Sequence, residues 1–155
     1  MNQLLEYRSK LVDQLEAAAE EFRQACLGVG DPFKAVEAGG WNTHQVAVHT
    51  RDVDRLVYGL RTRRTAQEDL PIFQNFDGDA WMAENYDADE PLASILDELS
   101  ASVKQTVALL NELPPEGWGR ESSHEIYGDG FTLQTWVERG LAHIQEHLDT
   151  VKKAV

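Results

Sequence analysis

Cysteine is almost absent from this chain, because its 155 residues include only Cys26. A single thiol excludes an internal disulfide, which is typical of proteins in a reducing compartment, so we expect a cytoplasmic protein. Cys26 follows Ala25 and precedes Leu27 in an apolar stretch. Two interpretations of this residue stay open: a small side chain that packs in the core, or a reactive thiol.

Long apolar runs are also missing. No segment approaches the roughly 18 to 20 apolar residues that a helix needs to cross a bilayer. Charged residues are spread through residues 1–22, whereas a secretory signal peptide needs a continuous apolar stretch. We therefore expect neither a membrane-spanning helix nor a signal peptide.

Basic residues are scarce. The chain has 14 Lys and Arg against 27 Asp and Glu, which gives a formal net charge of -13. Nucleic-acid binding depends on basic patches, and docking on an anionic membrane depends on clusters of Lys and Arg. The charge balance therefore argues against nucleic acid and membranes as partners and leaves small molecules or other proteins.

The residues that are present predict one helical domain that spans residues 1–155. A chain of this length fits a single domain, and 42% hydrophobic residues are enough for a packed core. Apolar residues recur at spacings of three and four over four long segments, namely 4–27, 43–64, 91–113 and 133–153. No alternation is long enough to support a sheet. The expected fold class is all-α, a four-helix bundle.

Residues at the ends of these segments are typical of helix termini. Gly28 favours a left-handed cap after the first helix, and Asn42 or Thr43 can cap the second. Pro91 suits the first position of the third helix, and Thr132 can cap the fourth. The four predicted helices therefore have defined boundaries.

Two connections between the helices are long, residues 65–90 and 114–131. Helix connections in compact domains have a median of about 4 to 6 residues. The first connection includes a short helix near residues 79–84, and at 26 residues it can run back along the bundle. The second and third long helices can then be parallel, which predicts an up-down-down-up order.

Three of the five histidines are placed to meet. His143 and His147 are four residues apart on one side of the last helix, and His49 points inward from the second. His44 falls on the opposite, solvent side of the second helix, and His124 belongs to the second connection. His49, His143 and His147 are therefore candidate ligands of one metal ion.

Two interpretations of this trio remain open. Neutral imidazole binds zinc, nickel, iron and copper, and an i, i+4 pair presents two nitrogens to one metal. Alternatively, each histidine is an amphipathic residue at the edge of the core, and the protein is an interaction module. Asp52, one turn beyond His49, is a hydrogen-bond partner of that histidine, a proton acceptor or a solvated surface carboxylate.

Several short sequences occur in a familiar order along the whole chain. They are Trp41-Asn42-Thr43 before the second helix, His49-Thr50-Arg51-Asp52 inside it, Phe131-Thr132-Leu133 at the last helix start, and His143-Ile144-Gln145-Glu146-His147. In order and spacing they resemble the DinB/YfiT-like superfamily of metal-binding four-helix bundles.

The resemblance implies an up-down-down-up bundle, usually dimeric, with a divalent metal held by three histidines. The matching positions here are His49, His143 and His147. The superfamily includes mycothiol-dependent maleylpyruvate isomerases and bacillithiol transferases, together with many members of no established activity. The isomerases have an extra domain after the bundle that is not obvious here, so we do not expect that particular activity.

We therefore expect an enzyme that depends on a divalent metal (Zn, Ni or Fe) and acts on a small electrophilic molecule. The expected reaction is hydrolysis or transfer of a low-molecular-weight thiol, with Asp52 as the partner of His49 or as a proton acceptor. The alternative is a non-catalytic, stress-related metal-binding protein. In either case a homodimer is expected.

Overall fold

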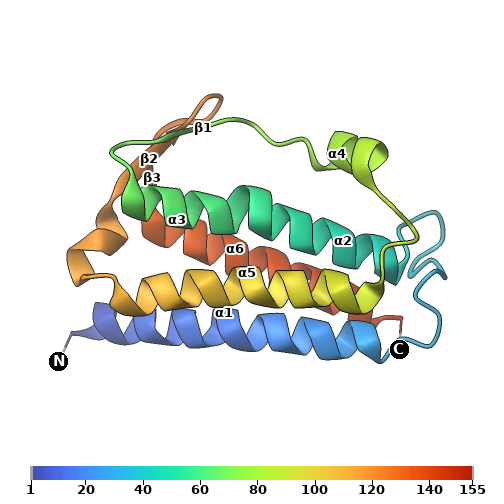
Figure 1. Cartoon of the computed structure of the whole chain (residues 1–155). Helices are drawn as coiled ribbons and strands as arrows, with labels where there is room; N and C mark the ends of the chain where they lie inside the picture. The colour runs from blue at the N-terminus through green and yellow to red at the C-terminus, as the bar shows by residue number, and fades with distance from the viewer. Residues whose placement is uncertain (1, 155) are drawn as a thin grey trace.

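Four long helical rods lie side by side in the computed structural model, which describes residues 2–154 (Figure 1). The rods are α1 (Gln3–Leu27), the continuous run of α2 (Thr43–Val53), η1 (Asp54–Tyr58) and α3 (Gly59–Gln67), then α5 (Leu92–Glu112) and α6 (Leu133–Lys152). A short helix, α4 (Gly78–Asn85), lies in the connection between α3 and α5. The expected four-helix bundle is confirmed, with bounds within a few residues of those predicted.

The helices follow the expected up-down-down-up order. In Figure 1, α1 and α6 run from the left end of the bundle to the right, whereas α2–α3 and α5 run from right to left. The connection that carries α4 crosses the length of the bundle between α3 and α5, so these consecutive helices are parallel. Helices α5 and α6 each pack against both α1 and the α2–α3 rod.

The helix caps follow the sequence closely except at Gly28 and at Pro91, which is the N-cap before α5 and not its first residue. Asn42 caps α2: its side chain accepts the backbone N–H of Gln45, and the Gln45 side chain accepts that of Asn42. Thr132 caps α6 by accepting the backbone N–H of Thr135. Gly28 ends α1 with φ of -81°, so the expected left-handed cap is wrong.

The core lies between the rods, where Phe22, Ile95 and Ile144 are at most 1% exposed. Cys26 is fully buried among them, and burial raises the pKa of its thiol to about 12. A thiol with so high a pKa forms almost no thiolate near neutral pH, so Cys26 is a packing residue.

A small sheet corrects the expectation that the chain forms no strands. β2 (Glu121–His124) pairs in parallel with β1 (Ile72–Phe73) and antiparallel with β3 (Gly128–Thr132). Strands of two to five residues are too short to show an alternating pattern, and the pairing joins two distant connections. The sheet lies where α3 ends and α6 begins (Figure 1).

A π-helical turn, η1, interrupts the second rod where it faces α6. The Gly59 N–H donates to the Asp54 carbonyl, and a Cβ at Gly59 would lie 2.6 Å from that oxygen, so the missing side chain permits this turn. Such turns often occur at functional sites. On α6, a Cβ at Gly140 would lie 3.1 Å from Tyr58 Cβ, so the small residue leaves room for Tyr58.

His44 is buried, which contradicts the prediction that it faces solvent. The side chain is 1% exposed, its Nε2 lies 2.7 Å from the Glu90 carbonyl oxygen, and its Nδ1 lies 2.7 Å from the Tyr86 hydroxyl. A carbonyl only accepts hydrogen bonds, so Nε2–H is the donor to Glu90. The segment before α5 covers this side of α2, which a helical wheel of α2 alone cannot include.

Within residues 2–154, none of the helices combines the length and the apolar character needed to cross a membrane.

Candidate metal centre

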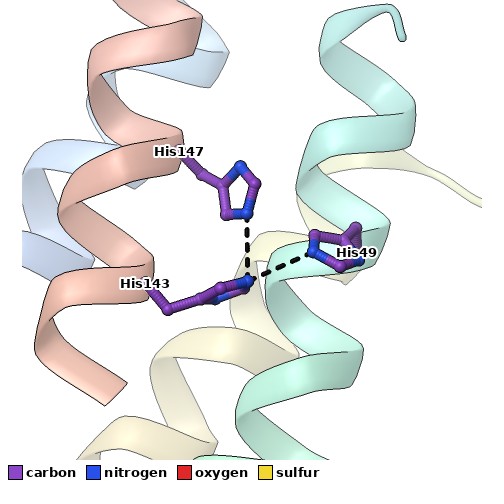
Figure 2. Close-up of side chains that lie close together, drawn as sticks. All are labelled: His49, His143 and His147. Carbon is purple, nitrogen blue, oxygen red and sulfur yellow. Dashed lines mark hydrogen bonds between the residues drawn. The ribbon is translucent and has the colours of Figure 1, made fainter. Parts of the chain in front are cut away.

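Three histidine side chains converge between α2 and α6. Figure 2 shows His49 on α2 pointing toward His143 and His147 on α6. The Nε2 atom of His143 lies 3.1 Å from Nε2 of His49 and 3.0 Å from Nε2 of His147. One ligand nitrogen from each ring lies within 4.8 Å of the other two. The expected convergence of the trio is therefore present.

The local sequence directs each ring to this point. His143 and His147 are one turn apart on α6, with ring centroids 4.3 Å apart. Ile144 and Leu148, the residues that follow them, are buried and fix the rotation of α6. On α2, His49 lies beside fully buried Thr50, which holds that helix against the core.

Residues from two connections cover His49. The Trp41 ring lies 4.9 Å from the His49 ring, measured between centroids. Gly78, the first residue of α4, lies so close that a Cβ on it would be 3.3 Å from His49 Cε1. A larger side chain at position 78 would press on the imidazole, so the glycine lets α4 close over the site.

Burial favours the neutral form of the three imidazoles. Burial and, second to it, the charge of His147 together lower the pKa of His49 to about 4 and that of His143 to about 3. Burial also lowers the pKa of His147, whereas Glu146 acts in the opposite direction. Neutral imidazole is the form that binds metal ions.

The donor set fits a divalent ion. With metal–nitrogen bonds of about 2.0–2.1 Å, neighbouring ligands are about 2.8–3.0 Å apart around an octahedral ion and about 3.3–3.4 Å apart around a tetrahedral ion. The two short Nε2–Nε2 distances, 3.0 and 3.1 Å, lie at the upper end of the octahedral range and just above it. Imidazole nitrogens suit zinc, nickel, iron and copper. In the described part of the chain, the cluster contains neither a carboxylate nor a thiol.

Asp52 is close to the cluster but is bonded elsewhere. The residue is 5% exposed, so its interpretation as a solvated surface carboxylate is wrong. Its oxygens accept from Arg51 Nε at 2.9 Å and from Trp81 Nε1 at 3.1 Å. Within residues 2–154 no hydrogen bond joins Asp52 to His49. The charge of Asp52 nevertheless acts on His49, because it partly offsets the lowering of that histidine's pKa by burial. A role as proton acceptor stays a prediction.

A cavity of about 550 Å³ adjoins the cluster. His49 and His143 belong to its lining, together with three residues toward the sheet that the sequence did not mark as site residues, Arg61, His124 and Arg139. Small-molecule sites span about 300–1,000 Å³, so the cavity has the size of such a site. The only sequence signal for these three residues was their residue type.

The lowered pKa of His143 predicts a pH-dependent stability of the metal-free protein. Its pKa falls from 6.5 to about 3 on folding, so between these values the unfolded chain binds a proton that the folded protein does not. Stability rises with pH wherever the unfolded chain binds more protons. We therefore expect acid to destabilise the wild type more than the His143→Asn variant. The difference between their free energies of unfolding, wild type minus variant, should fall as the pH is lowered from about 7 to about 4.

Urea denaturation in EDTA at several pH values measures this difference. Both proteins contain Asp54, whose pKa is raised to about 6 by burial and acts in the opposite direction, so the subtraction removes its contribution. A difference that stays constant with pH would contradict a buried, neutral His143.

Comparison with known proteins adds a family and a fold. The model of the DinB superfamily matches residues 14–151. Among solved structures, one similar chain is YfiT from Bacillus subtilis, described as a probable metal-dependent hydrolase with an unusual four-helix bundle topology. It is 23% identical, with a TM-score of 0.85 over 96% of this chain and 86% of that chain. None of the curated proteins matches this sequence.

Proposed function

The chain belongs to the DinB superfamily, and we propose that it is an enzyme in which His49, His143 and His147 hold a divalent metal ion. The observation that carries this proposal is the meeting of three imidazole nitrogens beside a cavity of small-molecule size. The proposed reaction is hydrolysis of a small electrophilic molecule. The similarity to YfiT, a probable metal-dependent hydrolase, supports this choice.

The residues of the chain have distinct roles in this mechanism. The three imidazoles would hold the ion through the Nε2 atoms that face one another, which would leave the proton of each neutral ring on Nδ1. When bound, zinc, nickel or iron supplies Lewis acidity that activates water or a thiol near neutral pH. Three protein ligands leave further positions open for the reacting molecules.

Asp52 acts at a distance from the ion by positioning the cavity wall. Its carboxylate accepts the Trp81 indole N–H, and the Trp81 ring lies 5.8 Å from the Phe76 ring between centroids. Phe76 lines the cavity next to His49 and Gly78. This series of contacts holds α4 and the preceding segment over the site and limits the access of bulk water.

Transfer of a low-molecular-weight thiol is the second candidate function. Cys26, the one cysteine of the chain, is fully buried in the core and is not a lining residue of the cavity. A thiol reaction at the three histidines would therefore need a diffusible thiol such as mycothiol or bacillithiol. A non-catalytic metal-binding role is the remaining alternative.

Metal removal and reconstitution test the function. We expect about one equivalent of bound metal, loss of ester hydrolysis in EDTA, and recovery with zinc, nickel or iron. The substrates are a panel of p-nitrophenyl esters, and parallel reactions offer an aryl halide with mycothiol, bacillithiol or glutathione. His147→Ala should lose both the metal and the turnover.

Each outcome separates the candidates. Conversion only with a thiol would favour transfer over hydrolysis. Bound metal without conversion in any reaction would favour the non-catalytic alternative, and a protein that takes up no metal would overturn both enzymatic proposals. We also propose that the protein acts as a cytoplasmic homodimer, which light scattering of the purified protein and cell fractionation can check.

A further inference from the structure

Two arginines line the cavity without an acidic partner. Arg61 and Arg139 both belong to its lining, and neither forms a salt bridge with the acidic side chains that the structure describes. The chain has 27 acidic residues for 14 basic ones, so partners are plentiful. Arg61 is only 7% exposed, and a charge so buried is normally paired.

Aromatic rings hold both guanidinium groups in place. The Arg61 guanidinium carbon lies 4.8 Å from the centroid of the Trp136 ring, and one of its N–H groups donates to the Gln74 carbonyl at 2.9 Å. The Arg139 guanidinium carbon lies 5.2 Å from the Phe131 centroid and 5.9 Å from that of Trp136. Contacts with ring faces orient a guanidinium and leave N–H groups at its edge free to donate.

His124 adds a third donor beside the arginines. Its Nδ1 accepts the backbone N–H groups of Ile126 and Tyr127 at 3.1 and 3.3 Å. A neutral imidazole has one N–H, so the proton is on Nε2. The structure gives Nε2 no hydrogen-bond partner in residues 2–154, and His124 lines the cavity. Burial lowers the pKa of His124, and so do the charges of Arg61 and Arg139.

Arg139 lies one helical turn from the histidine cluster on α6. Arg139, His143 and His147 follow one another at intervals of four residues, so they share one side of the helix. Four residues correspond to a rise of about 6 Å. A small molecule of a few bonds can therefore contact Arg139 and the cluster at the same time.

We propose that Arg61, His124 and Arg139 form an anion site that binds the carboxylate or phosphate of a small substrate whose electrophilic atom lies at the three histidines. Three donors and no carboxylate acceptor suit an anion, and planar guanidinium groups match both carboxylate and phosphate. Phe131, a half-buried residue of the lining, provides an apolar surface for the body of the molecule. The substrate class rests on the proposed function, whereas anion binding does not.

Binding to the metal-free protein tests the anion site separately from catalysis. Isothermal titration calorimetry in EDTA compares benzoate, phenyl phosphate and neutral benzyl alcohol. At least one of the two anions should bind at least about tenfold more tightly than the alcohol, because charge-assisted hydrogen bonds are strong. The tighter anion shows whether the site takes carboxylates or phosphates.

Two arginine variants complete the test. Arg139→Gln replaces an exposed side chain and should weaken binding of the tighter anion at least about tenfold. The matched control is Arg64→Gln on α3: Arg64 pairs with Glu68 and does not line the cavity, so this variant should bind as wild type.

The results distinguish this inference from the proposed function. Equal binding of benzyl alcohol and both anions, or unchanged anion binding by Arg139→Gln, would overturn the anion site even if the protein hydrolyses esters. Conversely, anion binding that depends on Arg139 in a protein that takes up no metal would uphold the site and overturn the proposed function.

Discussion

Replacing His143 with alanine should leave the protein almost without bound metal. The Nε2 atom of His143 is the middle member of the trio, at 3.1 Å from His49 and 3.0 Å from His147 (Figure 2). Its removal leaves two imidazoles and, among the residues that the structure describes, no third ligand in the cluster. Loss of an outer hydrogen-bond partner already weakens metal binding about 10- to 100-fold, so we expect loss of a ligand to exceed about 100-fold.

Elemental analysis after dialysis and competition with a chelator measure this effect. The matched control is Gln145→Ala, an exposed position two residues farther along α6 that should retain wild-type affinity. Circular dichroism of both variants in EDTA checks that the helices are intact. A His143→Ala protein that holds a full equivalent of metal would contradict the three-histidine centre.

Replacing Trp136 with alanine should lower the free energy of unfolding by about 3–5 kcal/mol. The side chain is 1% exposed, and its Nε1–H donates to Ser122 Oγ of β2 at 2.8 Å. Its ring stacks on Phe131 of β3, with centroids 4.9 Å apart, and meets the edge of Phe73 of β1 at 5.8 Å. One side chain of α6 therefore contacts all three strands, so its loss leaves a cavity and also detaches the sheet.

Urea denaturation followed by circular dichroism measures this loss without relying on tryptophan fluorescence. Trp136→Phe is the control, because it keeps an aromatic ring and removes the N–H donor, and it should cost about 1–3 kcal/mol. Metal binding by Trp136→Ala should persist under native conditions, since all three histidines lie on α2 and α6. A cost below about 1 kcal/mol would mean that Trp136 does not anchor the sheet.

The two histidines of α2 show where helical geometry is sufficient and where it fails. His49 was expected to point inward, and it meets the α6 pair. His44 was expected in solvent, yet the segment that carries Tyr86 and Glu90 covers it. The angle around a helix gives the direction of a side chain, but it does not say which distant segment lies in that direction.

The same distinction applies to the polar groups around the site. Asp52 was expected to be a partner of His49, a proton acceptor or a solvated carboxylate, but it is buried and its hydrogen-bond partners are Arg51 and Trp81, the latter 29 residues away in the sequence. The proposed anion site combines Arg61 of α3, His124 of β2 and Arg139 of α6. No local pattern marks such a set, because its members come together only when the sheet closes over the end of the bundle.

The amino-acid sequence by itself determined the four helices, most of their caps and the histidine pair one turn apart on α6. It also showed that a 26-residue connection is long enough for the second and third long helices to be parallel. The helices, their caps and the histidine pair depend on residues that are close together in the sequence. The spacing of apolar residues indicates a helix, and capping residues mark where the helix begins and ends. Only the tertiary structure decided that α2 packs beside α6, that short strands pair across two connections, and that two arginines face a cavity without carboxylates. Such contacts depend on which surfaces bury one another, and the spacing of residues along a single helix does not contain that information.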